Sequence, residues 1–386
     1  MPVYHSLGQF PRKRHQISRQ PSGALYAEEL MGNMGFAGSS SLLYHVHPPT
    51  AVKEIRAGKS AVVQKAAGEP VRHRHFRTHT LGGTVSPVAD RIALLVNQDL
   101  LLSTVHPSEN LSAFYRNAQA DEIVYVSQGA GRVETSFGNL DFAPGDYLVI
   151  PRGIVHRYRF TSPDPRTLVI IESVGFVRTP KRYRNEFGQL LEHSPYSERD
   201  IRRPTDLETH DETGDFPVLV KKADQFVELV YTHHPFDVVG WDGFYYPWSI
   251  SIHDFEPRVG RFHLPPPVHQ TFEGDGFVVC SFCPRPYDFD PEAVPAPYNH
   301  SNVMSDEVLY YANSEFMSRS GIEFGSVTLH PDGLAHGPQP GRTEKSLGQK
   351  ETNELAVMVD TFRSLHVAEP ALAVEDKDYY LSWLVR

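Results

Sequence analysis

The chain has 386 residues, enough for two domains with full hydrophobic cores. A hydrophobic content of 40% excludes a disordered protein, and a formal net charge of −10 argues against nucleic acids and anionic membranes as partners. No stretch approaches the roughly 18 uninterrupted apolar residues of a transmembrane helix, and the amino terminus lacks the apolar core of a secretory signal. We therefore expect a globular cytoplasmic protein, and its 31 prolines and 28 glycines suit a turn-rich all-β fold.

The segment 1–84 is predicted to be an amino-terminal arm with accessory strands. Residues 1–24 are basic and rich in turns, which is typical of a solvated arm. His45 and His47 form an H-x-H motif, but no carboxylate follows at the spacing of a metal site, so we interpret them as structural. The basic run around His73-Arg74-His75 is expected to be solvated or to face another subunit.

Residues 85–178 are expected to form a first β-barrel, because apolar and polar residues alternate in its strand-like runs. The charged stretch 179–235 is predicted to be a linker. Residues 236–386 should hold a second barrel and a carboxy-terminal tail. The only cysteines, Cys280 and Cys283, lie in a strand-like run without a second pair, so we expect buried free thiols.

An internal repeat relates the two expected barrels. Both copies contain an Asp-Glu pair followed by a strand, and later a glycine eleven residues before a histidine, with a Pro-x-Gly turn between. Glu122 thus matches Glu307, and His156 matches His336. An offset of about 180 residues is too long for a solenoid and indicates two similar β-domains in tandem. The pattern resembles the cupin family of jelly-roll β-barrels, in which this glutamate and this histidine bind metal.

The two copies differ seven residues before the glutamate. The second copy has His300 there, whereas the first has Tyr115. Two imidazoles and one carboxylate, brought together by neighbouring strands, are the ligand set of a non-haem Fe(II) centre with open coordination positions. We therefore predict a metal site at His300, Glu307 and His336, and a metal-free structural first barrel.

Three motifs support a narrower resemblance. They are Phe236-Asp-Val-Val-Gly-Trp-Asp-Gly-Phe-Tyr-Tyr-Pro-Trp, the H-x-N-x-M-S motif that starts at His300, and His336-Gly-Pro. Together they resemble the homogentisate 1,2-dioxygenase family. The resemblance implies that His300, Glu307 and His336 bind Fe(II), that His269 acts on the substrate as a base, with His263 as the alternative, and that the protein forms a trimer-based assembly.

The chain departs from this family at several positions. Asp306 stands where the family usually has the glutamate, and so remains an alternative ligand, although the repeat favours Glu307 because Asp121-Glu122 has the same order. Phe316 and Arg319 replace a tyrosine and a lysine that lie near the substrate in the family. The basic group is kept and a hydroxyl donor is lost, which leaves the substrate open.

The resemblance implies a ring-cleaving dioxygenase that uses O₂ on homogentisate or a close hydroquinone acid. The product would be of the maleylacetoacetate type, in tyrosine and phenylalanine catabolism. The substrate carboxylate needs a cation or a hydrogen-bond donor, and the candidates are Arg319, Arg285 and Tyr310. The alternatives are a gentisate-type dioxygenase, a cupin isomerase or hydrolase that uses Zn²⁺ or Mn²⁺, and a non-enzymatic storage or binding protein.

Overall fold

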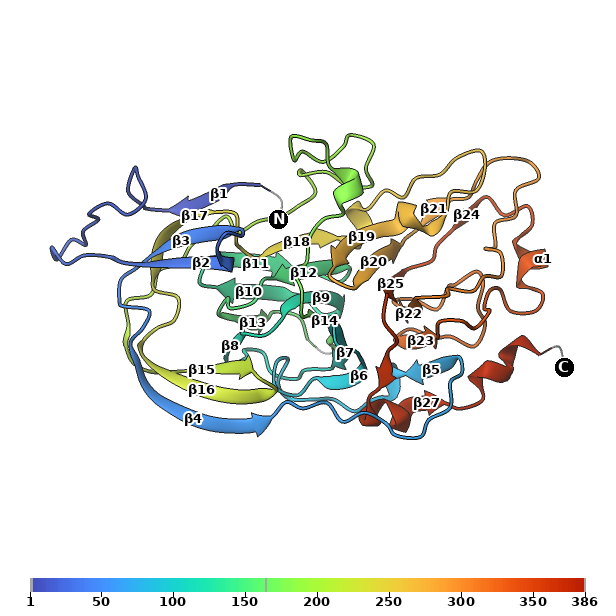
Figure 1. Ribbon diagram of the computed structural model, residues 1–386, viewed down its shortest axis with the longest axis horizontal. Helices are drawn as coiled ribbons and strands as arrows, with labels where there is room; N and C mark the ends of the chain where they lie inside the picture. Colours follow the sequence, from blue (N-terminus) through green and yellow to red (C-terminus); the bar gives the residue numbers. More distant parts are fainter. Residues whose placement is uncertain (1–2, 164, 385–386) are drawn as a thin grey trace.

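The computed structural model describes residues 3–163 and 165–384, and β-strands form nearly all of its regular structure (Figure 1). The predicted all-β fold class is confirmed. The helices within these residues are α1 (Arg342–Ser346) and the short 3₁₀ turns η1 (Thr78–Thr80), η2 (Lys181–Tyr183), η3 (Ile252–Asp254), η4 (Pro266–His269), η5 (Glu369–Val374) and η6 (Tyr379–Trp383). Within the same residues no helix has the length and hydrophobicity of a membrane span.

Two seven-stranded sheets form the first barrel. One contains, in spatial order, β11 (Gly138–Phe142), β10 (Gly131–Thr135), β13 (His156–Phe160), β8 (Phe114–Asn117), β15 (Thr213–Lys222), β16 (Gln225–His233) and β4 (Val52–Ser60). The other contains β18 (Trp248–Ser251), β12 (Asp146–Ile150), β9 (Asp121–Gln128), β14 (Thr167–Ser173), β7 (Leu100–Val105), β6 (Ile92–Val96) and β26 (His366–Val367). Buried side chains connect the two sheets, as where the hydroxyl of Tyr115 on β8 donates to Glu122 on β9 at 3.2 Å.

A third seven-stranded sheet belongs to the second repeat. It contains β19 (Gln270–Gly274), β20 (Phe277–Phe282), β25 (Ala356–Thr361), β22 (Asp306–Tyr311), β23 (Ser326–His330), β5 (Arg74–Arg77) and β27 (Glu375–Asp376). One face of this sheet meets loops and the two-stranded pair β21 (Arg285–Pro286) and β24 (Glu351–Thr352). Five prolines between residues 284 and 297 disfavour a second regular sheet there, because proline cannot donate to a strand ladder.

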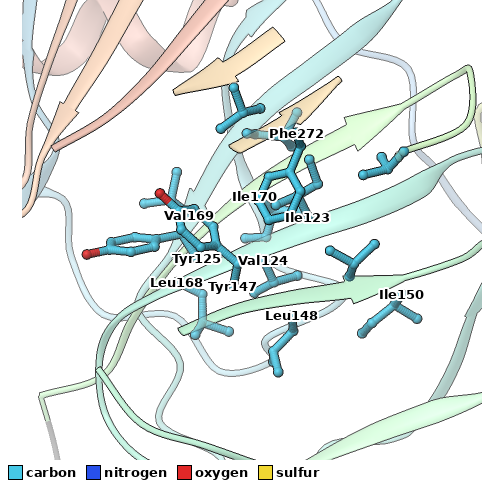
Figure 2. Packing of buried hydrophobic residues seen from close by; sticks show 14 of the residues in the cluster. Ile123, Val124, Tyr125, Tyr147, Leu148, Ile150, Leu168, Val169, Ile170 and Phe272 are labelled. Carbon is cyan, nitrogen blue, oxygen red and sulfur yellow. The ribbon is translucent and has the colours of Figure 1, made fainter. Parts of the chain in front are cut away.

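The hydrophobic core is continuous between the two repeats. Strands β9 and β14 are buried on both faces, so their sequences are nearly unbroken apolar runs. Figure 2 shows Tyr147 of the first barrel near Phe272 of β19, and their ring centroids lie 5.2 Å apart. Tyr147 also hydrogen-bonds Ser281 of β20 at 2.9 Å. The first barrel therefore packs against strands β19 and β20 of the third sheet.

The repeat seen in the sequence is present as a repeated strand order. The first barrel contains the neighbours β12, β9, β14 and β7, and the third sheet contains β23, β22, β25 and β20 in the same arrangement. The registers agree as well. Glu122 pairs with Ile150 and Glu172, while Glu307 pairs with His330 and Asp360. Each of the two glutamates thus occupies the same place in its sheet.

Several pairings cross the domain boundaries predicted from the sequence. The stretch 179–235 is not only a linker, because β15 and β16 lie within it and complete the first barrel. These strands were not recognised in the sequence because polar residues flank their turn. Lys222 and Gln225 are exposed, whereas Phe226 and Val230 are buried. The boundaries themselves remain a prediction.

The amino-terminal region also joins the body of the protein. Strands β1 (His5–Gly8), β17 (Val238–Gly243), β3 (Ser40–His45) and β2 (Ala27–Phe36) form a four-stranded sheet. The prediction that the surface around His73-Arg74-His75 is solvated or faces another subunit is wrong for two of these residues, because Arg74 and His75 on β5 are only 3% and 1% exposed within the single chain. Pairing of β5 with β23 buries them. Cys280 and Cys283 are free and buried, as predicted.

Candidate metal centre and cavity

The predicted metal ligands lie together at one end of the third sheet. Glu307 is on β22, while His300 and His336 are on two loops that the backbone joins. The amide of His300 donates to the carbonyl of His336 at 2.8 Å, and the amide of His336 donates back at 2.9 Å. One ligand atom from each of the three residues lies within 4.8 Å of the others. No other His, Cys, Asp and Glu group of this kind occurs in the described residues.

The orientation of the two histidines suits metal binding. Nδ1 of His300 and Nδ1 of His336 each donate to a backbone carbonyl, those of Tyr298 at 3.2 Å and Leu334 at 3.3 Å. Both Nε2 atoms are turned towards Glu307, at 3.7 Å for His300 and 3.4 Å for His336. Nε2 of His336 is buried and has no hydrogen-bond partner. A metal ion would supply that partner.

A third imidazole, which sequence reasoning missed, holds the carboxylate. Nδ1 of His330 donates to Oε1 of Glu307 at 2.8 Å. Burial, with Arg319 nearby, lowers the pKa of His330 to about 3, so its ring is neutral. Such a hydrogen bond fixes the orientation of a metal-binding carboxylate. The available signal was the overlay of the repeats, in which His330 replaces the apolar Ile150.

The two acidic residues at the start of β22 have different roles. Burial alone would raise the pKa of Glu307, but the neighbouring imidazoles of His300, His330 and His336 hold it well below its usual range. Asp306 is not in the ligand group, because its carboxylate accepts from the backbone amides of Asp332 at 2.7 Å and Leu365 at 2.5 Å. The structure thus places Glu307, and not Asp306, beside the histidines.

The ligand group opens into a cavity of about 490 Å³. Apolar side chains, including Leu309, Met358, Phe282 and Phe316, line it. Charged and polar side chains make up the rest of the lining, so the cavity joins an apolar wall to groups that can bind a polar ligand.

His269, the predicted base, lines this cavity at the end of η4. It is 8% exposed, and its buried Nδ1 has no hydrogen-bond partner. Burial, together with the charge of Arg285, lowers the pKa of His269 to about 3, so the ring is neutral. His263 also lines the cavity, but its side chain is 48% exposed and lies 3.8 Å from the carboxylate of Asp288. Geometry therefore favours His269 for the role of base.

The three predicted substrate contacts differ in their positions. Arg285 lines the cavity, but it already forms an ion pair with Glu354 at 3.1 Å. Arg319 also lines the cavity and is 5% exposed. It donates to the carbonyl of Gly337 at 2.6 Å, and no carboxylate of the described residues lies within ion-pair distance of it. Arg319 therefore carries a buried charge that a bound anion could compensate.

Tyr310 does not line the cavity, contrary to the prediction. Alternate residues of a strand face opposite sides of the sheet, so Glu307 and Leu309 face the cavity and Tyr310 faces away. Its hydroxyl donates to Ser127 of the first barrel at 2.6 Å. Tyr310 packs between the two repeats, where substrate has no access.

The first barrel has the sequence counterparts of this site but a different environment. Arg91 forms two hydrogen bonds with Glu122, at 2.6 and 2.9 Å. His156 is fully buried and packs against the ring of Tyr115, with centroids 5.3 Å apart. Here a protein cation neutralises the glutamate, which agrees with a structural role for this part of the fold.

Residues 7–252 match the sequence model of a family described as "Homogentisate 1,2-dioxygenase N-terminal". The chain belongs to the homogentisate 1,2-dioxygenase family. A relative from Saccharolobus solfataricus, named "Putative dioxygenase SSO1533", is 41% identical over 99% of both chains. A homogentisate 1,2-dioxygenase of Caenorhabditis elegans is 28% identical over 94% of this chain and 89% of its own. One from Pseudomonas syringae pv. tomato is 24% identical over 97% and 91%.

Family membership confirms the resemblance seen in the three sequence motifs and makes the protein an oxygenase. Among solved structures, a cupin 2 conserved barrel domain protein from Leptotrichia buccalis aligns with 77% of this chain and 100% of its own. It is 10% identical with a TM-score of 0.34, which is too low to add to the fold assignment.

Proposed function

We propose that this protein is an Fe(II)-dependent dioxygenase that opens the ring of homogentisate or a close hydroquinone acid, giving a maleylacetoacetate-type product. The observation that carries this proposal is the group of His300, Glu307 and His336, whose ligand atoms lie within 4.8 Å of one another beside a cavity with an apolar wall. Two imidazoles and one carboxylate suit Fe(II) and leave coordination positions for substrate and O₂.

The charges around the group also fit a divalent cation. Glu307 lies at the cavity with its pKa held well below the usual range, and the nearby His330 is neutral. None of the ion pairs of the described residues joins Glu307 to a lysine or arginine. Buried carboxylates are costly without a counter-charge, and a bound dication would supply it.

When bound, Fe(II) would supply the electron transfer that lets O₂ react with an aromatic ring. The residues of the chain would bind and orient the substrate. Leu309, Met358 and Phe316 would pack on the ring, and Arg319 would compensate the substrate carboxylate. Nδ1 of neutral His269 would accept the phenolic proton.

The remaining parts of the proposal follow from the family. We propose that the partners are a small aromatic acid and O₂, that the protein assembles from trimers, and that it acts in tyrosine and phenylalanine catabolism in the cytoplasm. Phe316 lines the cavity where the family tends to carry a tyrosine, so a hydroxyl donor is missing from this wall. A close relative of homogentisate is therefore included in the substrate class.

Anaerobic loading with Fe(II), followed by oxygen uptake with homogentisate and in parallel with gentisate, tests this function. We expect uptake with homogentisate or a close analogue and a new enol absorbance of the product. Uptake with gentisate alone would instead indicate a gentisate-type enzyme. Bound iron with no oxygen uptake on any hydroquinone acid, or turnover restored by Zn²⁺ alone, would overturn the dioxygenase assignment.

A further inference from the structure

A second carboxylate faces the cavity beside the predicted ligands. Asp360 lies on β25 directly opposite Glu307 on β22, and it lines the cavity together with His300 and Glu307. Met358, two residues earlier on the same strand face, is part of the apolar wall. Asp360 therefore stands where the apolar wall meets the ligand group.

The carboxylate of Asp360 lacks partners in the protein. Its Oδ1 is buried and accepts no hydrogen bond. Asp360 is not in the ligand group, which consists of His300, Glu307 and His336. A buried acceptor without a donor costs about 1–3 kcal/mol, so the fold gains no stability from this group.

The same position in the first barrel shows how a carboxylate is satisfied when it serves the fold. Glu172 lies opposite Glu122, as Asp360 lies opposite Glu307. Glu172 accepts from Lys221 at 2.7 Å and from Asn117 at 2.9 Å. None of the hydrogen bonds and ion pairs of the described residues gives Asp360 a comparable donor. The free oxygen is thus specific to the repeat that has the cavity.

We propose that Asp360 is a substrate-binding residue, whose free carboxylate oxygen accepts a hydrogen bond from a ring hydroxyl of the substrate. The inference rests on the proposed function, because it takes a hydroxylated aromatic acid as the ligand. A hydrogen bond to a carboxylate is about twice as strong as one between neutral groups. A methoxyl group cannot donate, so a substrate that carries one in place of this hydroxyl leaves Asp360 unpaired.

The test measures binding to the Fe(II)-loaded protein without oxygen, by isothermal titration calorimetry. The probes are 2,5-dihydroxyphenylacetate and its two monomethyl ethers. We expect the wild-type protein to bind the dihydroxy acid at least tenfold more tightly than one of the ethers. In Asp360→Leu this preference should fall below threefold, while the bound iron content remains that of the wild type.

Two further variants make the result decisive. Asp360→Asn keeps the shape of the side chain and covers the case in which leucine prevents folding, and it should reduce the preference at least threefold because a neutral acceptor is weaker. Asp275→Asn is the matched control, because Asp275 pairs with Arg178 in an exposed turn, with 56% of its side chain exposed. It should bind all three probes like the wild type.

The outcomes separate this inference from the proposed function. If the wild type prefers the dihydroxy acid and the folded Asp360 variants keep the same preference, the role of Asp360 is overturned and the proposed function stands. If the iron-loaded wild type binds none of the probes, the proposed substrate class is wrong and the role of Asp360 falls with it.

Discussion

The two repeats place a glutamate at the same point of the same strand order, but they treat its charge in different ways. In the first barrel, Arg91 binds both oxygens of Glu122, and Asn117 donates to one of them at 2.9 Å. In the second, Glu307 faces His300, His330 and His336. In the first barrel the guanidinium of Arg91 occupies the space beside the glutamate. In the second repeat the ligand atoms of His300, Glu307 and His336 face one another with no protein cation of the described residues between them.

This difference shows how a β-fold can serve both as scaffold and as site. A buried arginine–glutamate pair needs no further partner, so the first barrel can pack tightly behind the third sheet. The imidazole–glutamate group has no fixed cation, so its charge depends on what binds there. The following predictions break or sharpen this contrast, beginning with the largest effect.

The largest expected effect is complete loss of bound iron in Glu307→Ala. Glu307 supplies the carboxylate of the ligand group, so its removal leaves only two imidazole ligands. Metal analysis after anaerobic loading and gel filtration measures the loss, and oxygen uptake should disappear with it. Asp306→Ala should keep its iron, because Asp306 binds two backbone amides. The opposite pattern would assign the ligand role to Asp306.

The corresponding change in the first barrel should affect stability and not metal content. Glu122→Leu leaves Arg91 buried with Glu172 as its only ion-pair partner among the described residues, at 3.3 Å. Breaking a buried pair in this way costs about 3–5 kcal/mol, which urea unfolding would measure. The double variant Arg91→Met/Glu122→Leu should recover most of that loss. A single variant as stable as the wild type would show that the pair does not hold the barrel.

The sequence predicts those parts of the site whose positions depend on the spacing of residues along one strand or one hairpin. The Asp-Glu pair starts β22, and the glycine and the histidine lie before and after the next strand, β23, so their contacts are local. Successive residues of a strand face opposite sides of the sheet, and Tyr310 is three residues after Glu307, so it faces the opposite side. The predicted contact of Tyr310 with the substrate did not take this into account.

The parts that were missed depend on long-range pairing. Arg91 reaches Glu122 from the residue just before β6, and Asp360 meets Glu307 only because β25 pairs with β22. Likewise β15 and β16 gain their place between β8 and β4 from partners that lie far away in the chain. Neither the spacing of residues nor hydrophobic periodicity carries such information, because each strand can pair with several others until the core selects one arrangement.

A histidine between two carboxylates gives the reverse of the Glu307 arrangement. His45 lies 2.7 Å from Asp237 and 3.1 Å from Glu29, in the four-stranded sheet. Burial alone would lower the pKa of His45, but its hydrogen bond with Asp237 and its ion pair with Glu29 raise it to about 9. The folded state therefore holds this proton more tightly than the unfolded state does.

The stability that this proton contributes should be fully present below about pH 6.5 and lost as the pH rises to about 9, up to roughly 3 kcal/mol. Urea unfolding at about pH 6 and about pH 9.5 measures the loss. His45→Gln should be less stable than the wild type at the lower pH and should show a smaller loss between the two pH values. An equal loss in both proteins would mean that other groups cause the dependence.

The smallest effect concerns the residue that most distinguishes the two registers, His330 in place of Ile150. His330→Phe removes the hydrogen bond that holds Oε1 of Glu307 and keeps a ring in the same space. Loss of such a partner typically weakens metal binding about 10–100-fold, so iron should still bind, but less tightly. A competition titration with a chelator of known affinity measures the change.

His75→Phe is the matched control for this variant, since His75 on β5 is similarly buried but bonds to Ser326. It should leave the iron affinity near that of the wild type, because neither His75 nor Ser326 belongs to the ligand group. An equal loss in both variants would show that Glu307 is oriented by packing of the sheet, and not by the imidazole that pairs with it.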